Sequence, residues 1–222
     1  MEAGLRSFDR RMPEELNRIL TDSISSFLFV TEPSGVCNLR AEGVAEAKIH
    51  LVGNVMIDTL LRFRERAARS RVLETLGICP REYAVVTLHR PSNVDDPAQL
   101  RKLRGALTEQ GGEEAPGFNL IPPLGYLDFL RLMAEARLVL TDSGGIQEET
   151  TVLQVPCLTL RENTERPVTV EQGTNRLIGT DPAAIVDAAR QALATPAGPA
   201  RIPERWDGQA AGRILDVLEA GL

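Results

Sequence analysis

Short apolar runs alternate with helix-type repeats along most of the chain. After Pro13, the apolar residues Leu16, Ile19, Leu20 and Ile24 recur at the spacing of one helix face. Runs rich in Val, Ile, Leu and Phe, bounded by Gly, Pro or charged residues, read instead as buried strands. The pattern predicts helices over 13–24, 34–42, 55–70, 97–107, 126–136, 182–194 and 208–218, a helix beginning near 146, and strands over 27–30, 49–52, 83–88, 119–121, 138–140, 157–160 and 176–178.

This alternation is typical of an α/β protein with a doubly wound parallel sheet. We expect residues 83–181 to form such a sheet, with helices on both faces and the 138–140 strand near its middle. A boundary between two units is expected near 71–82. Ligands of such folds bind beyond the carboxyl ends of the strands, where His89 and Ser143 fall.

The polar stretch TEQGGEEAPG at 108–117 interrupts the alternation. Consecutive parallel strands need a crossover, so a strand is expected between the 97–107 helix and the 119–121 strand, and the sequence has none there. We expect the missing strand to leave its neighbours in the sheet with unpaired backbone groups.

The stretch LVLTDSGGIQEET at 138–150 organises the candidate chemistry. The glycine pair after the strand leaves N–H groups uncovered at a helix start, which is a seat for a phosphate or diphosphate. Glu148 and Glu149, one turn further, are placed to accept hydrogen bonds from ribose hydroxyls. The same residues also fit a plain helix start, with Ser143 as the cap and the glutamates favoured by the helix dipole. These residues alone leave both interpretations open.

Composition narrows the classes of protein. The 222 residues include 25 Lys+Arg against 31 Asp+Glu, a net charge of −6, which does not favour nucleic-acid binding. No apolar run has the length of a membrane span, and no signal peptide opens the chain. The three cysteines, Cys37, Cys79 and Cys157, suggest neither disulfides nor a zinc site. We interpret each as a small buried residue and expect a cytoplasmic protein without metal.

Linked motifs give a more specific indication. DSGGIQEE at 142–149, RENTERPV at 161–168 and EQGTNRLIG at 171–179 follow one another. EAGLRS at 2–7, PEELNR at 13–18, GNVMID at 53–58, and LHR at 88–90 with Asn93 precede them. In these motifs the chain resembles the non-hydrolysing UDP-N-acetylglucosamine 2-epimerases of bacteria, and the likeness covers almost every residue.

The resemblance implies a glycosyltransferase-B-like fold with the site between two domains. It implies a remnant of a first Rossmann-like domain and its crossover at 1–71, a UDP-binding Rossmann-like domain at 72–205, and a terminal helix at 206–222 that packs back toward the first domain. The family's reaction eliminates UDP across C1 and C2 of the sugar and adds it back with C2 inverted, converting UDP-GlcNAc to UDP-ManNAc. The implied partner is a UDP-sugar, and no cofactor is implied. A homodimer is one assembly compatible with the resemblance.

Matching the family's motifs residue by residue gives eight candidate site residues. Glu2, Glu14 and His89 match catalytic positions, the first two as proton-transfer acids and the histidine beside the diphosphate. The remaining five match UDP-sugar-binding positions: Ser143, Gly144 and Gly145 for the diphosphate, Glu149 for the ribose, and Arg166 for the sugar–phosphate.

The chain also departs from the family pattern. Pro91-Ser92 stands where the family usually has Arg-Glu, and a His-Pro-Arg loop is absent. The family's opening strands, an early Gly/Arg loop and a catalytic Asp have no counterpart in these residues. We therefore expect little or no epimerisation by this chain alone. Two alternatives are a glycosyltransferase of the same fold, which would not need Glu2 and Glu14, and a UDP-sugar-binding fragment.

Overall fold

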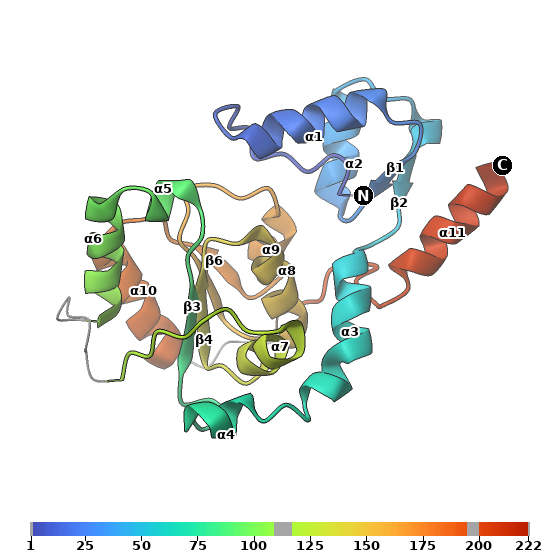
Figure 1. Ribbon diagram of the computed structural model, residues 1–222. Helices are drawn as coiled ribbons and strands as arrows, with labels where there is room; N and C mark the ends of the chain where they lie inside the picture. The colour runs from blue at the N-terminus through green and yellow to red at the C-terminus, as the bar shows by residue number, and fades with distance from the viewer. Residues whose placement is uncertain (1, 109–116, 195–199, 222) are drawn as a thin grey trace.

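The computed structural model describes residues 2–108, 117–194 and 200–221 and contains two parallel sheets (Figure 1). The first unit is built on a two-stranded sheet, β1 (Leu28–Val30) beside β2 (Ile49–Leu51). The second unit is built on a four-stranded sheet. The α/β class predicted from the pattern is confirmed.

The first unit has a small core of its own. Leu28 and Val30 of β1 pack with Leu39 of α2 (Pro33–Ala41) and with Ala3, whose N–H donates to the Phe29 carbonyl. Helix α1 (Pro13–Ile24) and a 3-10 helix, η1 (Glu46–Lys48), complete the unit. Helix α1 keeps much of its apolar stripe in solvent, since Ile24 is 87% exposed.

The second sheet has the order β3-β4-β5-β6, and all its neighbours run parallel. Its strands are β3 (Ala84–Thr87), β4 (Leu138–Thr141), β5 (Cys157–Thr159) and β6 (Asn175–Leu177). Strand β4 lies between β3 and β5, so the predicted parallel sheet with the 138–140 strand in its interior is confirmed.

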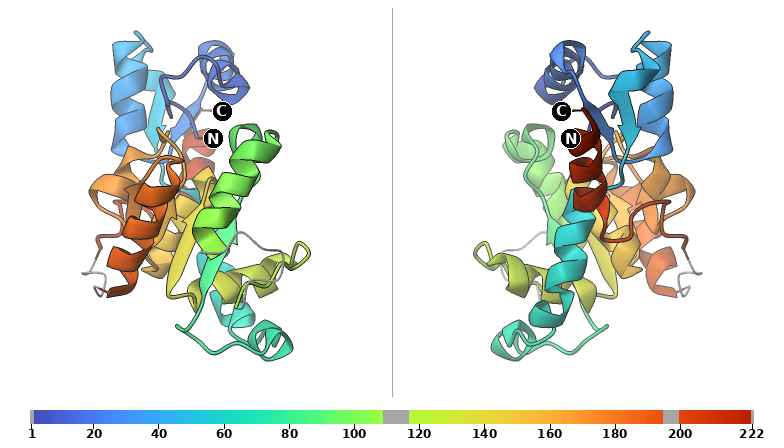
Figure 2. Two further views of the ribbon diagram at one scale, coloured as in Figure 1. Left: turned by 90° about the vertical axis from the view of Figure 1, so that its left-hand side faces the viewer. Right: turned by 90° about the vertical axis from the view of Figure 1, so that its right-hand side faces the viewer.

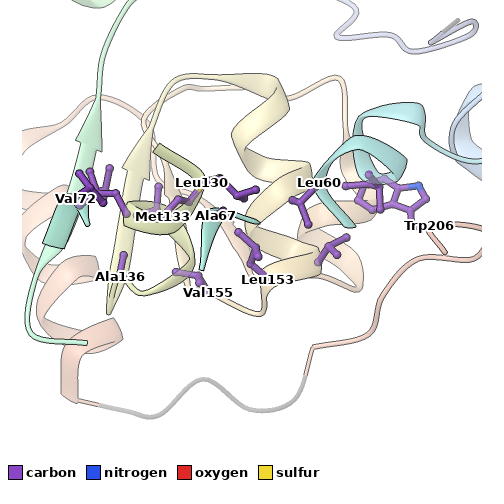
Figure 3. Packing of buried hydrophobic residues seen from close by; sticks show 14 of the residues in the cluster. Leu60, Ala67, Val72, Leu130, Met133, Ala136, Leu153, Val155 and Trp206 are labelled. Atoms are coloured by element: carbon purple, nitrogen blue, oxygen red, sulfur yellow. The ribbon is translucent and has the colours of Figure 1, made fainter. Parts of the chain in front are cut away.

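Side chains of β4 alternate between two cores, one on each face of the sheet. Leu138 and Leu140 join the core beneath α6 (Pro97–Thr108) and α10 (Pro182–Ala194). Val139 points to the opposite core, where α3 (Val55–Ala67), α4 (Val72–Leu76), α7 (Tyr126–Ala134) and α8 (Gly144–Leu153) pack (Figure 3). Helices therefore cover both faces, as the doubly wound pattern predicts.

Two segments tie the units together. Helix α3 leaves β2 and packs Ile57, Leu60 and Ala67 into the core of the second unit. Trp206, which is buried beside Leu60 in Figure 3, donates its indole N–H to the Thr31 carbonyl of the first unit at 2.9 Å. Helix α11 (Ala210–Gly221) then runs from α3 back toward the first unit (Figure 2).

The predicted strand at 119–121 is wrong, because residues 118–125 form no regular structure and Leu120 is 90% exposed. In a doubly wound sheet of order 3-2-1-4-5-6, this third strand pairs with the second. The sequence lacks the second strand, and the polar stretch at 108–117 that stands in its place lies mostly outside the described residues, so β3 ends the described sheet. A strand with no neighbour has no partner for its backbone groups and does not persist.

Two smaller expectations also need correction. Helices α5 (Pro91–Val94) and α9 (Pro167–Glu171) occupy positions that the pattern assigned to loops; each begins with a proline at its first turn. Of the three cysteines, only Cys157 is buried, while Cys37 and Cys79 are exposed. The interpretation of those two as core residues is wrong.

Candidate functional site

The turn between β4 and α8 presents an uncapped helix start. Ser143 is the N-cap residue, but its side chain makes no capping hydrogen bond. Ser143 thus holds the N-cap position expected for a plain helix start, but without the side-chain bond of a cap. The first N–H groups of α8 lack that side-chain acceptor, and the helix dipole makes this end positive. The N-terminus of α8 therefore favours binding of an anion, and the side chain of its N-cap residue does not provide an acceptor.

Buried Asp142 fixes the loop that follows β3. Its carboxylate accepts hydrogen bonds from the backbone N–H groups of His89 and Arg90, at 3.1 and 3.0 Å, and from the Asn93 amide at 3.0 Å. His89 Nδ1 lies 2.7 Å from Asp142 Oδ1, and the imidazole is 61% exposed. The sheet thus holds the predicted His89 beside the glycine turn, with its Nδ1 side engaged and most of the ring in solvent.

The two glutamates of α8 are buried carboxyls with perturbed acidity. Burial, together with the charge of Glu148, raises the pKa of Glu149 to about 7, although the Tyr126 hydroxyl opposes the shift. Burial also raises the pKa of Glu148 to about 7, against the attraction of Arg166. Ionised carboxylates rarely lie this deep unless a partner or a ligand compensates the lost hydration.

Arg166, just before α9, is the centre of the charged cluster. Its guanidinium lies 3.1 Å from Glu148, 2.5 Å from Glu165 and 3.1 Å from Glu2. Burial alone would lower the pKa of Arg166, but Glu148, Glu165 and Glu2 raise it instead. Burial would raise the pKa of Glu165, yet Arg166 and Arg161 hold it at about 2. Arg166 is therefore charged and fixed in orientation.

Gly144 is required by this arrangement. A Cβ added there would lie 2.5 Å from Arg166 Nη1 and 2.8 Å from Glu165 Oε1. At Gly145 it would lie 2.8 Å from the Met56 side chain of α3. The paired glycines let the buried guanidinium and α3 approach the start of α8 closely.

The first unit contributes acids to the same place. The carboxylate of Glu2 accepts a hydrogen bond from Arg166 of the second unit. The Glu2 backbone has φ +63°, a conformation that few non-glycine residues adopt. Glu14, at the start of α1, is 3.7 Å from the guanidinium of Arg90 in the loop after β3. Arg90 in turn lies 3.7 Å from Glu165. Glu2, Glu14 and Arg166 thus lie at the junction of the two units, with the glycine turn against Arg166 and His89 at the neighbouring strand end. Glu149 lies deeper in α8, beside Tyr126.

Comparison with known proteins agrees with these motifs. A family model described as UDP-N-acetylglucosamine 2-epimerase matches residues 1–115 and 109–219. This chain belongs to that family. A UDP-N-acetylglucosamine 2-epimerase of Methanocaldococcus jannaschii is 41% identical over 218 positions, covering 85% of this chain and 60% of that protein. A UDP-2,3-diacetamido-2,3-dideoxy-D-glucuronate 2-epimerase of Pseudomonas aeruginosa is 40% identical, covering 87% of this chain and 60% of that protein.

Solved structures of epimerases share the fold. The crystal structure of the M. jannaschii UDP-GlcNAc 2-epimerase in complex with UDP-GlcNAc and UDP is similar with a TM-score of 0.91 at 37% identity. It covers 100% of this chain and 68% of the other. The glycosyltransferase-B-like arrangement expected from the motifs is therefore confirmed.

This epimerase-family chain spans about 60% of the length of these two relatives. In the M. jannaschii alignment, 85% of the chain, about 189 residues, is spread over 218 positions. About 30 positions therefore have no residue here. The two family-model matches meet at 109–115, which puts an interruption at the polar stretch. The prediction that the chain lacks an internal segment of the family is supported.

Three residues of the candidate site were missed by sequence reasoning. Asp142 is the acceptor for the His89 loop, Glu165 pairs with Arg166, and Glu32 is buried at the unit junction. Asp142 follows a buried strand directly, a position that could have marked it. No local signal distinguishes Glu32 from an exposed acid before Pro33.

Among the described residues, no group of three metal-ligating side chains gathers, and no helix is long and apolar enough to cross a membrane.

Proposed function

We propose that this chain binds a UDP-sugar at the junction of its units and belongs to an enzyme that epimerises UDP-N-acetylglucosamine at C2. The observation that carries the proposal is the meeting of Glu2 with Arg166. This ion pair joins an acid of the first unit to the arginine that packs against the glycine turn of the second unit. The names of the family and its relatives support the same substrate class.

The residues divide into binding and proton-transfer roles. Ser143, Gly144 and Gly145 hold the diphosphate on the uncapped start of α8, with His89 nearby and Arg166 on the sugar–phosphate. Glu149 accepts hydrogen bonds from the ribose. Glu2 and Glu14 transfer protons at C2: a base removes the C2 proton as the C1–O bond to UDP breaks, and UDP adds back after C2 is protonated on the opposite face. Donors placed where the leaving diphosphate gains charge stabilise this transition state.

The organisation of the chain belongs to the same proposal. We divide it into a partial first domain at 1–71, a UDP-binding domain at 72–205 and the closing helix at 206–222. The cytoplasmic location and the lack of nucleic-acid partners stay predictions. A homodimer is proposed from the exposed stripe of α1, where Leu20 is 65% and Ile24 87% exposed.

One observation favours a second substrate. The P. aeruginosa relative is nearly as similar as that of M. jannaschii, yet it is named for a diacetamido-glucuronate sugar. Both would leave the same UDP, so the nucleotide half of the site serves either. The glycosyltransferase alternative is less well supported, because it gives Glu2 and Glu14 no task at C2.

The test separates binding from turnover. The purified 222-residue chain is titrated with UDP by calorimetry, and UDP-GlcNAc is incubated with it in deuterated water while NMR monitors the C2 proton. We expect UDP binding together with little or no exchange at C2. Exchange that disappears in Glu14→Gln would show that the chain is catalytically sufficient. No UDP binding by the folded chain would overturn the proposal.

A further inference from the structure

A network of neutral polar side chains adjoins the charged cluster, and the proposed reaction gives it no task. Its members are Gln147 of α8, Thr159 of β5, Thr164 in the loop before α9, Thr169 of α9 and Asn175 of β6. All of them except Thr164 are buried. Buried amides and hydroxyls must find their hydrogen-bond partners within the protein, so their contacts show what they hold in place.

Gln147 is the centre of this network. Its amide oxygen accepts hydrogen bonds from the Thr164 hydroxyl at 2.7 Å and from the Asn175 amide at 3.1 Å. Its amide nitrogen donates to the carbonyl of Ser143, at the glycine turn, at 3.2 Å. One buried side chain therefore joins the glycine turn, the loop that carries Arg166 and the sheet.

Asn175 fixes the network to the sheet. Its side-chain oxygen accepts a hydrogen bond from the Thr159 hydroxyl of the neighbouring strand at 2.6 Å. Its amide nitrogen donates both to Gln147 and to the Thr169 hydroxyl, at 3.1 Å in each case. Because β5 and β6 are paired strands, the sheet sets the orientation of Asn175 and, through it, that of Gln147.

Both branches of the network end on the backbone of Arg166. The Thr164 hydroxyl, which donates to Gln147, accepts a hydrogen bond from the Arg166 N–H at 3.1 Å. The Thr169 hydroxyl, which accepts from Asn175, donates to the Arg166 carbonyl at 2.8 Å. Each hydroxyl thus uses its one proton once, and the directions of all these bonds are consistent. The backbone N–H and C=O of Arg166 are therefore both held by the network.

The loop before α9 has no regular structure of its own to hold Arg166. Residues 160–166 form neither helix nor strand, and Arg166 has φ −124° and ψ 62°, outside the common backbone regions. Its guanidinium has carboxylates on several sides, so charge alone does not select one orientation. Neutral hydrogen bonds add little net stability, whereas a fully satisfied polar network specifies one arrangement.

We propose that Gln147 is a positioning residue that sets the separation between the glycine turn and Arg166, through its bonds to Ser143 and Thr164. The inference rests on the proposed function, in which the turn holds the diphosphate and Arg166 the sugar–phosphate. A diphosphate contacts both, so its affinity depends on their separation, while the ribose contact at Glu149 does not. Loss of the Gln147 amide lets the turn and the loop move independently.

Four variants separate the hydrogen bonds from side-chain packing. Gln147→Met keeps the length of the side chain but supplies neither the amide donor nor the amide oxygen. Thr164→Val removes the hydroxyl that links Gln147 to Arg166, and Thr164→Ser keeps it. Thr75→Val on α4 is the matched control, since it removes an exposed hydroxyl that bonds the Arg71 carbonyl one turn earlier. Thermal unfolding of each variant gives the range in which it is folded.

The first measurement needs no ligand. NMR of the isotope-labelled free chain records the arginine Nε–H signals, and the Arg166 signal is assigned by its absence from Arg166→Lys. Arg166 Nε is buried, so its hydrogen should exchange slowly with water in the wild type. Exchange should become roughly tenfold faster in Gln147→Met and Thr164→Val, the scale of one lost hydrogen bond. It should keep the wild-type rate in Thr164→Ser and Thr75→Val.

The second measurement compares UDP with UMP by calorimetry. UMP has the same ribose and lacks the second phosphate, so the ratio of the two affinities reports on the diphosphate. We expect this ratio to fall roughly tenfold in Gln147→Met and Thr164→Val and to stay unchanged in Thr164→Ser and Thr75→Val. A role in stability alone would lower the unfolding midpoint and leave both the ratio and the Arg166 signal as in the wild type.

The outcomes distinguish this inference from the proposed function. Wild-type Arg166 signals or UDP-to-UMP ratios in folded Gln147→Met and Thr164→Val would overturn the positioning role, as would equal losses in Thr164→Ser and Thr164→Val. If no protein binds either nucleotide, the proposed function fails, and the NMR signals alone decide whether Gln147 positions Arg166. If Gln147→Met does not fold, the comparison of Thr164→Val with Thr164→Ser decides.

Discussion

Replacing Asp142 by Asn should destabilise the second unit and weaken the site together. The buried carboxylate receives N–H groups from His89 and Arg90 and the amide of Asn93, and it lies 2.7 Å from His89 Nδ1. An amide of the same shape keeps one acceptor and turns an N–H₂ group toward these donors. At least one buried donor is then left without a partner.

The size of the loss can be bounded from these contacts. A hydrogen bond to a charged group contributes about 1.5–3 kcal/mol, and an orphaned buried donor costs about 1–3 kcal/mol. Water can reach the part-buried N–H of His89 and Arg90, which reduces the loss. We expect the free energy of unfolding to fall by about 2–3 kcal/mol.

The assay is urea denaturation followed by the fluorescence of Trp206, the only tryptophan, which is buried at the junction. Asp216→Asn on exposed α11 is the matched control and should change the free energy by less than about 0.5 kcal/mol. UDP titration of the folded variant should show weaker binding, because the His89 loop is released. An Asp142→Asn protein as stable as the control variant would refute this account of the loop.

Three further predictions test separate features. Glu149→Ala should weaken UDP binding in calorimetry by about 1–3 kcal/mol, since the ribose hydroxyls lose their acceptor, and unchanged affinity would contradict the ribose role. Gly144→Ala should lower unfolding stability by about 1–3 kcal/mol, because its Cβ would meet Arg166 at 2.5 Å; Gly212→Ala, with open space around it, is the control and should not destabilise. A thiol reagent should modify Cys37 and Cys79 quickly in the native protein and Cys157 only on unfolding, because burial raises the pKa of the Cys157 thiol to about 12; rapid labelling of all three would show that β5 opens.

Regular periodicity made most of the fold predictable. Helix α10 was predicted with the observed bounds, Pro182–Ala194, and the strands before His89 and Ser143 were placed within one or two residues. The 119–121 strand failed because an apolar triplet forms a strand only where a neighbour can pair with it, and the described sheet has no strand beyond β3 to do so. Local pattern carries no information about a missing partner.

The candidate site was predictable only where motifs repeat a known spacing. The glycine turn and Arg166 were predicted in this way, whereas the contact between Arg166 and Glu2 required the fold, since 164 positions separate the two partners. The roles of Asp142 and Glu165 depend on tertiary contacts that no sequence period encodes. Glu32 looks like an ordinary acid before a helix until the second unit covers it.

The contrast between the interior of the second unit and the junction argues that the charged cluster exists for function. The core beneath the sheet is apolar, with residues such as Leu130, Met133 and Val139 fully buried. The junction, only a turn of helix away, buries Arg166 with Glu148 and Glu165. Apolar side chains of similar volume would usually stabilise a protein at least as well as such a cluster, because buried ions lose their hydration. Buried charges with several shifted pKa values in one place are typical of ligand-binding and catalytic sites. The cluster lies at the carboxyl end of the parallel sheet, where folds of this kind bind their ligands.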